Sequence, residues 1–164
     1  MIKSGPTRRA RGPLGRIILY SRIFPESSER EGVMLEQVLK NAIPNQLSLF
    51  GKLTEGHDPY HFAAWDKEGN IAILRYWFWN RTKTKQNRKR VFINELEGLL
   101  KNSLISRSIS RKDFEKYCPR TLGDGSCGFA VIIGILQHFQ VVDVVDGEYR
   151  VKNIERILQL LNNQ

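Results

Sequence analysis

Apolar residues recur at helical spacing in several parts of this chain, and each part predicts a helix with one buried face. A capping sequence at Ser28–Glu31 opens a pattern that ends ahead of Pro44, so we expect a helix over residues 28–42. Residues 14–24 also fit a helix, although residues 16–20 would suit a strand. Further helices are predicted from Asn94 through Leu104, over 111–118, over 126–139 with Ser126 as the cap, and from an Asn153 cap onward.

Shorter apolar runs predict strands. Residues 61–66 and 71–79 flank a polar turn, and a third strand over 90–93 would complete an antiparallel meander. Residues 141–151 predict a second hairpin, because Asp146 and Gly147 tolerate the positive φ angles that a two-residue turn needs. The predicted fold class is therefore α+β.

The order of elements over residues 94–164, helices followed by a hairpin and a closing helix, resembles the winged helix-turn-helix family. The resemblance implies a winged-helix-like region that binds DNA, which would follow the helices and the three-stranded antiparallel meander that the patterns above predict. The serine-rich stretch 103–110 is the expected domain boundary. We therefore divide the chain into a flexible basic arm (1–13), a basic α+β domain (14–106) and a winged-helix-like domain with its closing helix (107–164).

The net charge of +9 favours an anionic partner, most often nucleic acid. Residues 1–106 carry 18 basic and 10 acidic residues, whereas residues 107–164 carry eight and seven, so the positive field belongs to the first two-thirds. No apolar run approaches the ~20 residues that span a bilayer, and no secretion signal is evident. We expect a cytoplasmic protein that does not contact a membrane, with Cys118 and Cys127 reduced.

The segment 81–90 carries six basic residues and no acidic one, and it would form a flexible basic finger between two strands that contacts phosphates. Four aromatic residues, 76–79, precede it. In a strand, two of them would face the core, and the other two could stack on single-stranded bases unless a helix covers them. The alternative is that all four pack inside and that the charged loop is only solvated.

Other basic residues extend the predicted interface. The partner of the winged-helix-like region could be either DNA or a protein. Residues 122–139 offer no Arg or Lys to a major groove, and the hairpin carries Asp143, Asp146 and Glu148, which would repel phosphates. This region would therefore suit a protein partner as well as DNA, with a homodimer or another protein bound through residues 153–164. The predicted phosphate contacts are Arg8, Arg9, Arg11, Arg81, Lys83, Lys85, Arg88, Lys89, Arg90, Arg111, Lys112 and Arg120.

Two patterns raise the question of catalysis. Residues 123–129, Gly-Asp-Gly-Ser-Cys-Gly-Phe, resemble the nucleophile motif of ovarian-tumour-type cysteine proteases, which implies Cys127 as nucleophile and Asp124 beside the oxyanion site. That family needs a histidine well downstream, and this chain has none after His138. The second pattern is a cluster of metal-ligand types that would suit a Mg²⁺-dependent nuclease: His57, Asp58, His61, Asp66 and Glu68.

From these patterns we expect a non-catalytic nucleic-acid-binding protein that needs no cofactor, with double-stranded DNA as the ligand. A nuclease that uses the region of His57, Asp58 and His61 is the first alternative, and a protein-interaction adaptor is the second.

Overall fold

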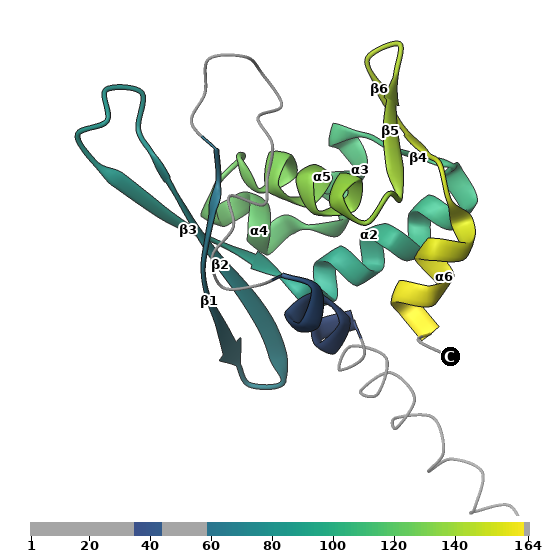
Figure 1. Ribbon diagram of the computed structural model, residues 1–164, viewed down its shortest axis with the longest axis horizontal. Helices are drawn as coiled ribbons and strands as arrows, with labels where there is room; N and C mark the ends of the chain where they lie inside the picture. The colour runs from purple at the N-terminus through teal and green to yellow at the C-terminus, as the bar shows by residue number, and fades with distance from the viewer. Residues whose placement is uncertain (1–34, 44–58, 163–164) are drawn as a thin grey trace, which may run out of the picture.

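The computed structural model describes residues 35–43 and 59–162 of the chain, and it confirms the α+β class (Figure 1). Residues 35–42 are helical, as the pattern over 28–42 predicted. The elements that follow are β1 (His61–Glu68), β2 (Ile71–Trp79), β3 (Gln86–Phe92), α2 (Ile93–Ser106), β4 (Ser108–Ile109), α3 (Arg111–Tyr117), α4 (Pro119–Asp124), α5 (Gly128–His138), β5 (Val142–Val145), β6 (Glu148–Val151) and α6 (Ile154–Asn162).

Several predictions concern parts of the chain outside the described residues. They are the basic arm with Arg8, Arg9 and Arg11, the segment 14–24, the capping sequence at 28–31, and the pair His57 and Asp58. In the described part of the chain, no helix is long and apolar enough to cross a bilayer.

The predicted meander is confirmed, with strand order β1-β2-β3 and antiparallel pairing throughout. The third strand is longer than the predicted 90–93, since β3 begins at Gln86, where it pairs with Trp79, and ends at Phe92. Residues 86–90 are polar or charged, so they gave no apolar strand signal. They nevertheless form a strand that pairs with β2, because an edge strand with one solvated face tolerates charged side chains.

The second half contains a small sheet with strand order β4-β6-β5. The hairpin is as predicted, with φ angles of 54° at Asp146 and 79° at Gly147 in its turn. The two-residue strand β4 was not predicted, and it pairs Ser108 with Arg150. In chain order this half runs α2-β4-α3-α4-α5-β5-β6-α6, with β4 beside β6 in the small sheet.

Helix boundaries differ from the sequence patterns at two places. Helix α2 begins at Ile93 after Phe92 and without a side-chain cap, so Asn94 is not its cap. Helix α5 begins at Gly128 after Cys127, so Ser126 is not its cap either, and part of the predicted turn 119–125 is the short helix α4. The predicted cap of α6 is confirmed, because the Asn153 side chain accepts a hydrogen bond from the Arg156 N–H at 3.0 Å.

Helices α2, α4 and α5 pack against the meander (Figure 1), and Leu74, Tyr76 and Val91 are fully buried beneath them. Buried residues on both sides of the stretch 103–110 belong to one continuous hydrophobic cluster, which includes Leu96 of α2 and Ile132 of α5. The core therefore runs through the predicted domain boundary without a break.

The two cysteines are free, and their environments differ. Cys118 is fully buried, and this burial, followed by the nearby Glu95 carboxylate, raises the pKa of its thiol to about 12. The thiolate is the reactive form. We therefore expect Cys118 of the native protein to resist iodoacetamide at pH 8 and to react once guanidinium unfolds the chain. Peptide mass spectrometry measures this, and rapid labelling of native Cys118 would contradict the burial.

Candidate nucleic-acid interface

The meander has a second face, which we call the outer face, turned away from the main core. On β2 it carries Arg75, Trp77 and Trp79, at alternate positions to the buried Leu74 and Tyr76. The strand register sets partners beside these three side chains: His61 and Arg88 flank Trp77, Arg90 lies opposite Arg75, and Gln86 lies opposite Trp79.

The four aromatic residues 76–79 alternate as predicted. Tyr76 is fully buried and Phe78 packs against the core, whereas Trp77 is half-buried and Trp79 is 37% exposed. The alternative, in which all four lie inside, is wrong. The His61 ring stacks on Trp77 with centroids 4.1 Å apart and planes 16° apart, so neighbouring strands hold the indole in place.

A groove of about 570 Å³ lies on this side of the meander. It opens beside an irregularity in β1 between Phe62 and Ala64, where the strand register shifts. Its walls bring four cations and one indole together with a single carboxylate. The lining residues are Phe62, Ala63, Ala64, Arg75, Trp77, Gln86, Arg88, Lys89, Arg90 and Asp124.

The loop between β2 and β3 is smaller and more ordered than the predicted finger over 81–90. Residues 86–90 belong to β3, and the remaining turn closes around Asn80. The Asn80 side-chain oxygen accepts hydrogen bonds from the Thr84 N–H at 2.8 Å and the Lys85 N–H at 3.1 Å. Its amide nitrogen donates to the Thr82 and Thr84 hydroxyls. The turn thus presents Arg81, Lys83 and Lys85 from a fixed backbone, with all three side chains exposed.

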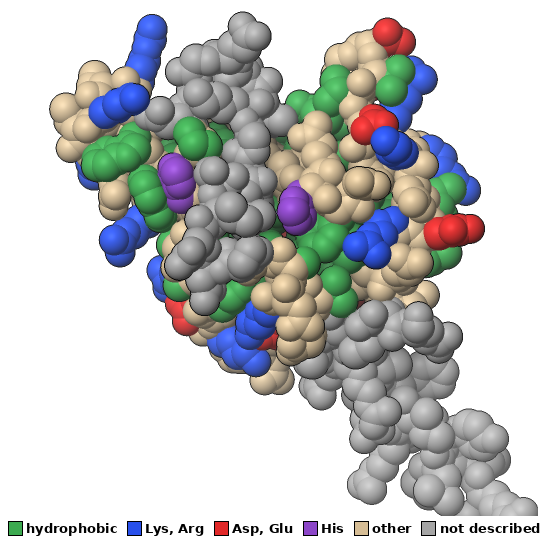
Figure 2. Space-filling view, viewed as in Figure 1, with side chains coloured by type: hydrophobic (Ala, Val, Ile, Leu, Met, Phe, Trp, Pro, Cys, Tyr) green, Lys and Arg blue, Asp and Glu red, His purple; other side chains and the backbone are tan. Residues whose placement is uncertain are grey.

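Several cations at this end of the meander have no acidic partner among the described residues. Within residues 35–43 and 59–162, no ion pair joins Arg81, Lys85, Arg88 or Lys89 to a carboxylate. Lys and Arg side chains lie beside hydrophobic ones at the tip of the meander, at the upper left of Figure 2. A surface of this kind attracts phosphates and displaces their counterions.

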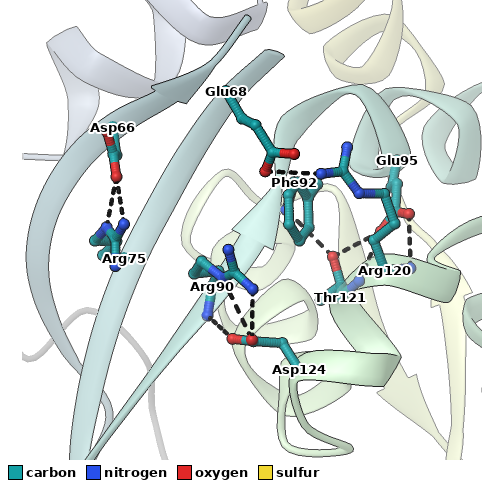
Figure 3. Close-up of polar contacts among 9 residues, drawn as sticks. All are labelled: Asp66, Glu68, Arg75, Arg90, Phe92, Glu95, Arg120, Thr121 and Asp124. Carbon is teal, nitrogen blue, oxygen red and sulfur yellow. Dashed lines mark hydrogen bonds and ion pairs between the residues drawn. The ribbon is translucent and has the colours of Figure 1, made fainter.

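The other end of the outer face is neutralised by carboxylates (Figure 3). Arg90 pairs with Asp124 at 2.9 Å, and Arg120 pairs with Glu68 at 2.8 Å. Both guanidinium groups also lie over the Phe92 ring, at 5.3 Å and 4.0 Å from its centroid. These two predicted phosphate contacts are therefore already engaged in ion pairs that cover Phe92.

Arg111 and Lys112, the remaining predicted contacts, lie on α3 beside the small sheet. Arg111 lies over the Phe129 ring at 5.3 Å and lines a separate pocket with Ser108 and Tyr149. Lys112 is exposed next to it. The predicted cations that fall within the described residues therefore do not share a single surface.

Helix α5 lies within residues 122–139, the stretch considered above for contact with a major groove, and it is a core helix. Its residues 128–136 are all buried except Ala130, which is half-buried, and only Gln137 and His138 are exposed. The charges of the hairpin are largely paired, Glu148 with Arg150 and Asp143 with Lys152, both at 3.1 Å. Reading a major groove needs exposed polar side chains along a helix, and α5 does not supply them.

The predicted metal cluster is only partly within the described residues. Asp66 pairs with Arg75, whose hydrogen bond lowers the pKa of this carboxyl, and Glu68 pairs with Arg120. His61 is stacked on Trp77. Over the part of the chain that the structure describes, no three potential ligand residues of the His, Cys, Asp or Glu type converge.

The protease-like segment is integrated into the core. The Cys127 sulfur lies 3.2 Å from the Tyr76 hydroxyl, and the Asp124 carboxylate forms an ion pair with Arg90. Burial, followed by the neighbouring Cys127, raises the pKa of Tyr76, so this phenol stays protonated. His138 lies at the other end of α5, away from the thiol. Neither described histidine, His61 or His138, is therefore placed to activate Cys127.

The expected partner surface on α6 is small. Ile154 and Leu158 lie one turn apart and are 36% and 42% exposed, while Ile157, Leu160 and Leu161 face the core. Self-association through this helix stays a prediction.

Sequence reasoning did not single out Arg75, which lies on the outer face and is paired with Asp66. The signal was present, because Arg75, Trp77 and Trp79 share one side of a strand whose alternate residues are buried.

In comparisons with known proteins, no protein-family model, no curated protein and no solved structure matches this chain.

Proposed function

We propose that this chain binds nucleic acid without catalysis, through the outer face of the meander and the turn at its tip. The observation that carries the proposal is the grouping of Arg81, Lys85 and Arg88 beside the outer-face indoles of Trp77 and Trp79, with no carboxylate paired to any of these three cations in the described part of the chain. These side chains would contact phosphates and thereby fix the position of the nucleic acid.

The proposed binding depends weakly on base sequence. Helix α5 is buried and bears no Arg or Lys, so phosphate contacts supply most of the affinity. A double-stranded DNA ligand, which the winged-helix resemblance implies, would have to be held by its backbones rather than read in its major groove.

Salt titration tests the proposal directly. Replacing Arg81, Lys85 and Arg88 together with alanine should reduce the magnitude of the slope of log affinity against log salt by about two to three, because each phosphate contact contributes roughly 0.7 to 0.9. Fluorescence anisotropy with labelled single-stranded and double-stranded DNA measures the slope. The matched control is the triple alanine variant of Lys116, Lys152 and Arg156, which removes the same charge from exposed positions outside the meander.

The control should keep most of the original slope. Equal losses in both triple variants would mean that net charge, and not this surface, governs binding, and the proposal would fail. A wild-type protein with no salt-sensitive affinity for any nucleic acid would instead support the adaptor alternative.

A further inference from the structure

Resting on the proposed function, we infer that the ligand of the outer face is single-stranded nucleic acid, whose unpaired bases stack on Trp77 and Trp79. Protein side chains bind single strands by combining a positive groove with aromatic rings. The outer face has the positive groove and the aromatic rings, and cross-strand pairing sets Arg88 beside Trp77.

The spacing of the two indoles suits splayed bases. Trp77 and Trp79 lie two residues apart on one face of β2, with ring centroids 6.1 Å apart. Successive bases of one strand in B-DNA are only about 3.4 Å apart along the axis, and they are enclosed between two backbones. Neighbouring bases can therefore meet both indoles only if they are unstacked from each other, as in an extended single strand.

The indoles are also held ready for a ligand. His61 stacks on Trp77 from β1 and fixes one side of the ring, while Trp77 still contributes to the groove wall. The two indoles meet edge to face, at 89°, so their ring planes are perpendicular to each other. Ring positions that are set before binding reduce the entropy lost when a base is bound.

Polar partners stand beside both rings. The strand register places Arg88 opposite Trp77 and Gln86 opposite Trp79, at the separation where cross-strand side chains touch. A base on Trp77 would thus have a guanidinium next to it for its phosphate, and a base on Trp79 would have an amide for its edge. The edge strand β3 would run along the nucleic-acid backbone.

Intrinsic fluorescence gives a direct test, because the third tryptophan is on the other side of the sheet. Trp65 packs against the core, and Lys40 lies over its ring at 5.6 Å. In a Trp65→Phe variant, oligothymidylate should quench the remaining emission strongly. In a variant that keeps only Trp65, with Trp77→Phe and Trp79→Phe, the same titration should change the emission little. Quenching of the Trp65 signal alone would overturn the inference.

Affinity measurements separate the inference from the function on which it rests. Trp79→Leu, at the exposed position, should weaken oligothymidylate binding about 5- to 100-fold, the range for losing one stacked base. Trp79→Phe should restore most of it, and binding to a hairpin duplex should change less than twofold in either variant. Trp77→Leu should act in the same direction.

Each outcome decides something. If the triple variant of Arg81, Lys85 and Arg88 loses affinity while Trp79→Leu binds oligothymidylate normally, the basic surface is correct and the stacking is wrong. Equal losses for single strand and duplex in Trp79→Leu also reject base stacking. If neither variant changes binding, both the inference and the proposed function fail.

Discussion

Replacing Glu95 by alanine is expected to lower the free energy of unfolding by about 3 to 4 kcal/mol, which is large for a single substitution. Glu95 lies on α2 and is buried, with 8% of its surface exposed. Its carboxylate accepts hydrogen bonds from the Arg120 N–H at 2.8 Å, the Thr121 N–H at 2.9 Å and the Thr121 hydroxyl at 2.8 Å (Figure 3). Alanine would leave these buried donors without an acceptor.

The size of the effect follows from the position of the carboxylate. Helix α4 has only six residues and no side-chain cap of its own, so Glu95 satisfies the N–H groups of its first turn from another helix. The Thr121 hydroxyl, held by Glu95, in turn accepts from the Phe92 N–H at 3.2 Å on β3. One side chain thus connects α2, α4 and the edge of the meander.

Chemical denaturation of two further variants provides the controls. Glu95→Gln keeps the shape and one acceptor oxygen, so it should lose less stability than Glu95→Ala. Glu97→Ala removes an ion pair with Lys101 one turn along the same helix, at 2.8 Å, and should cost less than about 1 kcal/mol. A similar loss for Glu95→Ala and Glu97→Ala would show that the buried contacts of Glu95 contribute little.

Gly128→Ala should destabilise the protein by about 1 to 3 kcal/mol, although alanine usually favours a helix. A Cβ at the first residue of α5 would lie 2.6 Å from the Thr121 methyl carbon and 3.5 Å from the Phe114 ring. Thr121 cannot rotate away without breaking its hydrogen bonds to Glu95 and Phe92. The close packing of α5 on α4 therefore requires glycine at this position.

Two variants make this prediction specific. Gly123→Ala, in α4, meets no atom within 4 Å, so it should be neutral or stabilise the fold by up to about 1 kcal/mol. Thr121→Ser removes the methyl group and keeps the hydroxyl, so in the double variant it should recover part of the loss caused by Gly128→Ala. Additive losses in that double variant would rule out the steric explanation.

The sequence by itself determined features that depend on neighbouring residues. Alternation along residues 76–79 placed two aromatics inside and two outside, and Asp146-Gly147 specified the turn of the second hairpin. Both follow from backbone geometry, which repeats every two residues in a strand and demands positive φ in a tight turn. The excess of positive charge in the first two-thirds was visible for the same reason, since it needs only a count.

Only the tertiary structure decided which charges are neutralised by ion pairs and which helix is buried. Arg90 meets Asp124 from 34 residues away, and Glu95 meets Thr121 from 26 residues away. No local pattern encodes such pairs, because they form only when α4 packs beside β3 and α2. The same packing buries α5 and leaves Trp77, Trp79 and Arg88 on the opposite side of the sheet. The position of the candidate interface therefore comes from long-range packing, whereas its residue types were already present in the chain.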